Sequence, residues 1–265
     1  MQFSTKQQLI GGGVILVIIG FVAWSTWSHA LGSSSSATTT PSTLASSTDS
    51  GVTSAPVATS TSTGPFPINV SDSLASWSFK GIYTGNDALV QKANADITLL
   101  TSLLGKGKYD DYDLYNGIAN DYGMLGEGSL AYQNFNRAIA IHPTKGLAYV
   151  NLGHLMAELG AYATAADAYG KAVAVEPGML EYHLERLTYL TQQFPKDTPR
   201  IVAALADASK QFGDNASILA IEARWLSAVG RYADAIKAWQ TAKMLLPGKD
   251  TSAIDAEIAR LQAKQ

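Results

Sequence analysis

The chain has 265 residues, of which 46% are hydrophobic and 15% are charged, and its formal net charge at pH 7 is −3. A small negative net charge without a basic stripe excludes the usual electrostatic surface for DNA or RNA, so no nucleic-acid partner is expected. The chain contains no cysteine, which excludes disulfides, thiolate zinc sites and cysteine nucleophiles.

The N-terminus carries an uncharged apolar stretch behind a short polar tail. Residues 9–27 would span roughly 28 Å as a helix, close to the ~30 Å hydrocarbon core of a bilayer. Lys6 is the only basic flank, so the positive-inside rule predicts a cytoplasmic tail (1–8), a transmembrane signal-anchor (9–27) and an extracytoplasmic C-terminal domain at the cell envelope or surface. The alternative is a cleaved signal peptide, because Ser28 and Ala30 offer the small residues that a signal peptidase inspects.

Residues 28–76 are predicted to be a disordered linker. Up to residue 64 this stretch consists almost entirely of Ser, Thr, Ala, Gly and Pro, without aromatic side chains or hydrophobic periodicity. Such a composition buries too little apolar surface to offset the entropy of ordering the chain. The folded domain is therefore expected over residues 77–265.

A 34-residue period organises that domain. Pro143 and Pro177 are 34 residues apart, and each follows a segment of helical character. Superposing the two segments aligns aromatic, large apolar and small residues. The aligned pairs are Tyr115/Tyr149, Ile118/Leu152, Ala119/Gly153, Tyr122/Met156, Gly126/Gly160, Ala131/Ala165, Phe135/Tyr169 and Ala138/Ala172.

This pattern resembles the tetratricopeptide repeat (TPR) family, in which aromatic-x2-Leu-Gly-x2-Tyr, Ala-x3-Phe and Pro recur over 34 residues. The resemblance implies an all-α solenoid of helical hairpins, with repeats at about 112–145, 146–179, 180–215 and 216–249. The last copy carries Ala223, Gly230 and Trp239 at the matching places. The 180–215 copy diverges: it contains an insertion at residues 194–199, and its first helix carries His183 and Arg186 at usually apolar positions.

The ends of a solenoid need polar capping elements. Residues 86–104 place apolar side chains on one helical face, and residues 251–265 do the same before a polar tail. Both segments are therefore predicted to be capping helices.

No group of residues indicates catalysis, a cofactor or a metal. The histidines are scattered, and His154 with Glu158 supplies only two possible ligands on one helix, where a structural zinc site needs four. We therefore expect a protein that is not an enzyme.

The resemblance implies that the first helix of each repeat lines a concave groove. Helical spacing from the core residues then gives a set of polar and charged side chains that face this groove. The set is Asn116, Asn120, Asn151, His154, Glu158, Glu181, Glu185 and Arg224.

Asn120 and Asn151 match two asparagines with which some relatives hold the backbone or the terminal carboxylate of an extended peptide. The basic residues that accompany them in those relatives are replaced here by Asn116, Glu181 and Glu185. The acidic side chains would repel a carboxylate at these places, so a neutral or basic segment is the expected ligand.

The expected function is that of a protein-binding scaffold or adaptor, exported across a membrane and tethered to it, which binds a partner protein or extended peptide. One alternative is a self-associating structural or spacer protein of the cell envelope. Another is that the groove holds only the chain's own C-terminal helix, residues 251–265.

Overall fold

The computed structural model describes residues 64–265. The predicted tail, the predicted transmembrane segment and linker residues 28–63 lie outside the described residues. None of the helices between residues 64 and 265 combines the length and the apolar character that a bilayer crossing requires. These helices are α2 (Asp87–Leu103), α3 (Asp111–Leu125), α4 (Gly128–Ile141), α5 (Leu147–Glu158), α6 (Tyr162–Val175), α7 (Leu180–Gln193), α8 (Thr198–Phe212), α9 (Ala216–Ala228), α10 (Tyr232–Met244) and α11 (Ser252–Gln262).

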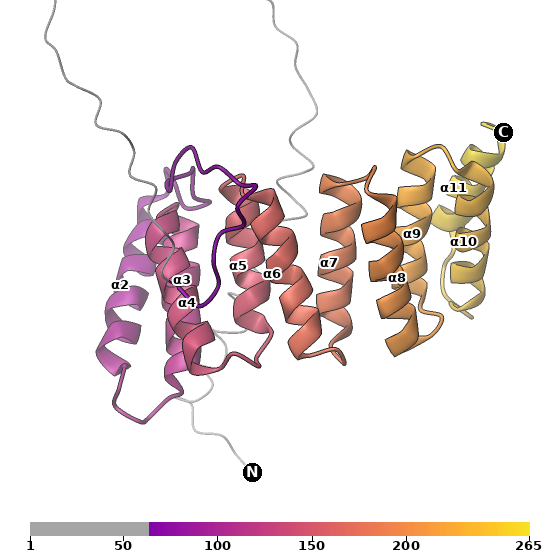
Figure 1. Cartoon of the computed structure of the whole chain (residues 1–265). Helices are drawn as coiled ribbons and strands as arrows, with labels where there is room; N and C mark the ends of the chain where they lie inside the picture. Colours follow the sequence, from indigo (N-terminus) through magenta and orange to yellow (C-terminus); the bar gives the residue numbers. More distant parts are fainter. Residues whose placement is uncertain (1–63) are drawn as a thin grey trace, which may run out of the picture. The chain divides into compact units, whose positions relative to one another are not determined.

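The helices form a row of antiparallel hairpins, arranged in chain order from α2 to α11 (Figure 1). The hairpins α3–α4, α5–α6, α7–α8 and α9–α10 occupy the positions of the four repeats. At the two ends, α2 and α11 lie where capping helices were expected. The described part of the chain therefore has the all-α solenoid architecture that the 34-residue period predicts.

Small residues let the helices of a hairpin approach closely. Ala119, Ala131, Ala165 and Ala223 are completely buried, each at a small position of the repeat pattern. Gly153 of α5 is another such position, because a Cβ atom there would lie 2.9 Å from the ring of Tyr169 on α6. Aromatic side chains fill the space beside these crossings, which gives the core of a close-packed helical solenoid.

The turns within the first, second and fourth hairpins share one geometry. Gly126, Gly160 and Gly230 each have a positive φ, between 76° and 85°, a conformation that glycine adopts without steric penalty. The α7–α8 turn differs, as the insertion at residues 194–199 predicts. There Asp197 caps α8 by accepting a hydrogen bond from the backbone N–H of Arg200 at 3.2 Å.

The divergent His183 replaces a tyrosine without loss of its hydrogen bond. In the second repeat the Tyr149 hydroxyl donates to the Pro143 carbonyl at 3.0 Å. In the third repeat the Nε2 of His183 makes the equivalent bond to the Pro177 carbonyl, also at 3.0 Å. His183 is buried, so it belongs to the packing of the repeat and not to its surface.

Residues 64–76, here called the strap, correct the predicted N-terminal boundary of the domain. They were assigned to the disordered linker, but they pack across α4 and α6 (Figure 1). The backbone N–H of Phe66 donates to the Asn136 side chain at 2.8 Å, and the Tyr132 hydroxyl donates to the Phe66 carbonyl at 2.6 Å. The ring of Phe66 meets that of Tyr149 edge-on, with 5.7 Å between centroids.

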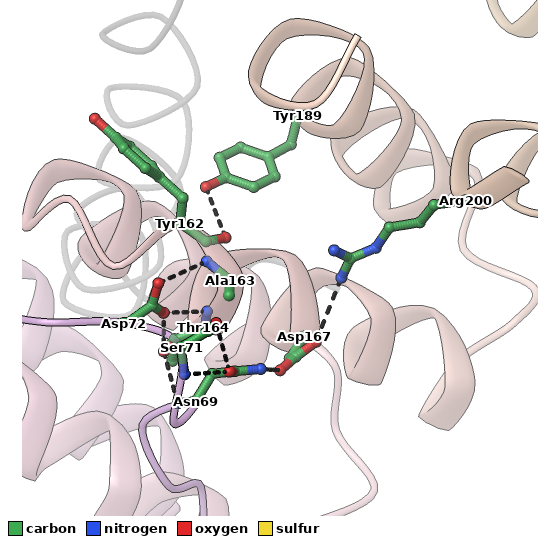
Figure 2. Close-up of polar contacts among 9 residues, drawn as sticks. All are labelled: Asn69, Ser71, Asp72, Tyr162, Ala163, Thr164, Asp167, Tyr189 and Arg200. Atoms are coloured by element: carbon green, nitrogen blue, oxygen red, sulfur yellow. Dashed lines mark hydrogen bonds and ion pairs between the residues drawn. The ribbon is translucent and has the colours of Figure 1, made fainter. Parts of the chain in front are cut away.

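The strap also supplies the N-terminal cap of α6, as Figure 2 shows. The Asp72 carboxylate accepts hydrogen bonds from the backbone N–H groups of Ala163 at 3.1 Å and Thr164 at 2.6 Å. The local N-cap residue, Ala161, has no side chain able to make such a bond. Asn69 adds a hydrogen bond from its side-chain amide to Asp167 at 2.6 Å. A residue 91 positions upstream of Ala163 therefore completes the start of this helix.

The tight crossing at Gly153 predicts opposite effects for two glycine substitutions. Gly153→Ala should lower the free energy of unfolding by about 1–3 kcal/mol, because the new methyl group overpacks the Tyr169 ring. Gly170→Ala in α6 should raise it by about 0.4–1 kcal/mol, because a Cβ there meets nothing within 4 Å and alanine favours the helix. Urea unfolding of both variants measures the difference, and stabilisation by Gly153→Ala would contradict the packing argument.

The remote cap predicts that Asp72→Ala destabilises the solenoid by about 0.5–2 kcal/mol, as the loss of a helix cap does. Thermal unfolding of the full chain checks the expected decrease in Tm. Asp214→Ala, which changes an exposed carboxylate on the α8–α9 connection, is the control of equal charge. Equal Tm values for the two variants would show that the Asp72 cap contributes nothing to stability.

Candidate functional site

The predicted groove residues lie on the first helices of the hairpins. Because these helices share one orientation in the solenoid, their side chains at matching positions lie on one face. Asn116 and Asn120 lie on α3, Asn151, His154 and Glu158 on α5, Glu181 and Glu185 on α7, and Arg224 on α9.

The three asparagines are buried and incompletely hydrogen-bonded. Asn116, Asn120 and Asn151 are 5%, 5% and 6% exposed. Within residues 64–265, the Oδ1 atoms of Asn116 and Asn120 and the Nδ2 atom of Asn151 have no hydrogen-bond partner. A buried polar atom without a partner costs about 1–3 kcal/mol. These three amide atoms therefore have unused hydrogen-bonding capacity.

His154 forms a buried polar cluster with residues of two other helices. Its Nδ1 lies 2.9 Å from the hydroxyl oxygen of Tyr169, and its Nε2 lies 3.7 Å from Oε2 of Glu185. The carboxylate beside Nε2 favours the tautomer with the proton on that nitrogen, so the Tyr169 hydroxyl donates to Nδ1. Burial lowers the pKa of His154 to about 4, so the imidazole is neutral at pH 7.

Three carboxylates give this part of the groove its charge. Burial raises the pKa of both Glu158 and Glu185, and Glu181 is exposed. No lysine or arginine among residues 64–265 forms an ion pair with any of the three. The side chains of this groove region are therefore neutral or acidic.

His154 and Glu158 do not extend to a metal site. In the part of the chain that the structure describes, no three His, Cys, Asp or Glu side chains are grouped so that they could hold a metal ion. The contacts of His154 are instead with a hydroxyl and a more distant carboxyl group. Its place in the structure is that of a buried hydrogen-bonding residue.

Arg224 belongs to a different part of the solenoid from this cluster. It lines a cavity of about 790 Å³ together with residues of α7, α9 and α11. The cavity includes none of Asn120, Asn151, His154 and Glu185. The eight predicted residues thus divide into seven polar residues on α3, α5 and α7 and Arg224, which lines the separate C-terminal cavity.

The C-terminal helix does not fill the groove. It packs against α10 with Leu261 fully buried, and Ala253 and Ile254 form one wall of the C-terminal cavity. This helix, which was considered as an occupant of the groove, thus forms part of the wall of the C-terminal cavity.

Two aromatic residues of the site are missing from the predicted set. Tyr169 and Trp239 occupy the same repeat position as Phe135, which the pattern assigns to the core. Their rings are indeed buried, but the Tyr169 hydroxyl reaches His154 and Trp239 lines the C-terminal cavity. In the sequence, the replacement of Phe135 by tyrosine and tryptophan, which carry polar atoms, was the feature that could have identified these two residues as part of a site.

The lowered pKa of His154 predicts a pH-dependent stability. The folded protein binds fewer protons than the unfolded chain between the unfolded pKa of 6.5 and the folded value of about 4. The neutral imidazole makes its full contribution to stability above pH 6.5, and this contribution is lost as the pH falls toward 4. In that range the free energy of unfolding decreases by at most about 1.4 kcal/mol per pH unit. Urea unfolding between about pH 4 and 8 should show a flatter profile for His154→Gln, and a profile parallel to that of the wild type would contradict the assignment.

Comparisons with known proteins gave matches among solved structures. No family model and no curated protein sequence matches this chain. Among solved structures, the thermophilic TPR protein TTC0263 of Thermus thermophilus is 19% identical, with a TM-score of 0.45 and coverage of 66% of this chain and 93% of that one. MamA is 14% identical, with a TM-score of 0.47 and coverage of 69% and 98%.

YrrB, described as a TPR protein with an unusual peptide-binding site, is 15% identical, with a TM-score of 0.45 and coverage of 61% of this chain and 81% of that one. The fold assignment itself follows from the hairpins, the 34-residue spacing and the small residues at the helix crossings. The all-α, tetratricopeptide-type solenoid predicted from the sequence is confirmed.

Proposed function

We propose that this protein is a membrane-tethered binding scaffold whose groove on α3, α5 and α7 takes an extended segment of a partner protein. The observation that supports this function is the set of unpartnered amide atoms on Asn116, Asn120 and Asn151. All three side chains are buried, so solvent does not easily replace a missing hydrogen bond.

The recognition chemistry is that of backbone amides. An extended peptide exposes N–H and C=O groups that an asparagine side chain matches with one acceptor and one donor group. In the proposed complex, Oδ1 of Asn120 accepts from a peptide N–H and Nδ2 of Asn151 donates to a peptide carbonyl. Contacts of this kind select for an extended backbone and leave the peptide sequence largely free.

The charge of the groove then restricts which peptide side chains are tolerated. An added anion near Glu158, Glu181 and Glu185 would experience repulsion on the order of 1 kcal/mol for each close pair in a solvated site. Since burial already raises the pKa of Glu185, a second negative charge beside it is further penalised. The ligand is therefore a neutral or basic segment.

The proposed setting is the outer side of a membrane. The uncharged apolar run at residues 9–27 and the single flanking basic residue, Lys6, support an uncleaved signal-anchor with the solenoid exported. The Ser/Thr-rich sequence that follows supports a flexible tether. A scaffold of this kind holds its partner close to the membrane surface.

The groove proposal predicts a loss of peptide binding in a double variant. The full chain, titrated with fluorescent basic, neutral and acidic peptides of equal length, should bind the basic and neutral peptides more tightly than the acidic one. Asn120→Ala combined with Asn151→Ala should weaken that binding about tenfold or more, because each lost hydrogen bond to a buried group contributes about 1 kcal/mol.

Asn134→Ala is the matched control, because Asn134 is equally buried but lies on α4 and bonds to the Leu130 carbonyl. Tighter binding of the acidic peptide, or unchanged affinity of the double variant, would contradict the groove proposal. Concentration-dependent size of the protein without peptide binding would favour the self-associating structural role instead.

A further inference from the structure

The C-terminal cavity combines a wide apolar wall with unused hydrogen-bond donors. Its volume of about 790 Å³ lies within the range of pockets that enclose a ligand of several side chains. The apolar wall comes from α7, α9, α11 and the segment before α11. Its large members are Leu184, Ile221, Leu246 and Ile254.

The first unused donor is the indole of Trp239. This residue is only 7% exposed, and its Nε1 is buried without an acceptor among residues 64–265. Trp225 shows the usual alternative, because its Nε1 donates to the Pro195 carbonyl at 2.9 Å. A buried indole N–H ordinarily has such a partner. The N–H of Trp239 is therefore an unmet donor in a residue that lines the cavity.

The second donor is the guanidinium of Arg224. It lies over the Trp239 ring, 5.7 Å from the ring centroid, and forms no ion pair within the described part of the chain. The carboxylate on the cavity wall, Glu257, is already paired with Arg260, whose Nε donates to it at 2.7 Å. The positive charge of Arg224 thus remains available to a ligand.

We propose that this cavity is a second recognition site, which takes an acidic side chain and a nearby apolar side chain of an extended partner peptide. The carboxylate accepts from Arg224 and, on a small shift of the indole ring, from the Trp239 N–H, which is buried in the free protein. The apolar side chain packs against the wall that Leu184, Ile221 and Ile254 form. This inference rests on the proposed protein-binding role, but it uses different residues and the opposite ligand charge.

The spacing of the two side chains follows from the geometry of an extended chain. Successive side chains point to opposite sides, whereas residues i and i+2 lie on the same side. A single cavity therefore accepts an apolar residue and an acidic residue that are separated by one position. The recognised pattern is apolar-x-Asp/Glu or its reverse.

The combined surface is asymmetric along the solenoid. Carboxylates without a lysine or arginine partner characterise the proposed groove on α3, α5 and α7, whereas a guanidinium without an ion-pair partner among residues 64–265 characterises the C-terminal cavity. A partner with basic or neutral residues for the first site and an apolar-acidic pair for the second would match both charges. This arrangement would also fix the direction in which the partner lies on the solenoid.

The test uses the full chain and four labelled eight-residue peptides. Three are C-terminally amidated and carry Leu-x-Glu, Leu-x-Gln or Ala-x-Glu at their centre, and the fourth is the Leu-x-Gln peptide with a free C-terminal carboxylate. Fluorescence anisotropy should show the tightest binding for Leu-x-Glu. Replacing Glu by Gln should weaken binding about tenfold, because a charge-assisted hydrogen bond is lost.

The variant Arg224→Gln should remove this preference for Glu over Gln, and Trp239→Phe should reduce it while the ring stays in place. Arg224 is exposed, so its substitution tests the proposal even if Trp239→Phe folds poorly. Arg137→Gln is the matched control: its guanidinium also lies 5.7 Å from an aromatic centroid, that of Tyr115, but it does not line the cavity.

Four results would overturn the proposal. One is an equal affinity of wild type for the Glu and Gln peptides, and another is an unchanged preference in Arg224→Gln. The third is self-association that Arg224→Gln abolishes, which would make a second copy of the chain the occupant. Tighter binding of the free-carboxylate peptide than of Leu-x-Glu would also count against a side-chain ligand.

The variants separate this site from the groove. If Asn120→Ala with Asn151→Ala leaves Leu-x-Glu binding unchanged while Arg224→Gln abolishes it, the cavity acts on its own. If the basic peptides fail to bind but Leu-x-Glu binds in an Arg224-dependent way, the groove proposal fails and the cavity proposal stands.

Discussion

The close crossing of two helices at a small residue is the constraint on which the solenoid depends. Where Gly153 meets Tyr169, the absence of a side chain lets the ring lie directly against the backbone of α5. The same contact places the Tyr169 hydroxyl beside His154, the next residue along the helix, at 2.9 Å. The close crossing of α5 and α6 thus determines both the packing of the core and the position of the polar groups around His154. A larger residue at 153 would disturb the core and the polar cluster together.

One repeat position carries side chains of different polarity while it preserves the buried core. Phe135, Tyr169 and Trp239 all fill the same space in their hairpins and are all buried. Phenylalanine has no polar atom, tyrosine reaches the imidazole of His154, and tryptophan lines a cavity with an unmet N–H. The repeat architecture therefore allows different recognition chemistry in successive units without any change in helix geometry.

The fold followed from local and periodic features, whereas the site depended on contacts between distant residues. The 34-residue spacing, the glycine at each short turn and the insertion before α8 are visible in sequence, because each acts within one hairpin. The strap is not visible in this way. Asp72 caps a helix that begins about 90 residues downstream, and the short apolar run around Phe66 has no periodicity that marks it as folded. The low pKa of His154 likewise arises from burial by neighbouring helices, which its own helix does not reveal.

The strap also determines where mechanical load enters the domain. The chain that precedes Gly64 joins the solenoid over α4 and α6 and not at the first helix, α2. Tension applied through that chain would act first on the bonds that Phe66 makes to α4 and that Asp72 makes to α6. Because α2 and α3 lie downstream of these bonds along the chain, they would carry no load until the strap detached. The strap would therefore shield α2 and α3 from tension that enters through its own N-terminal end.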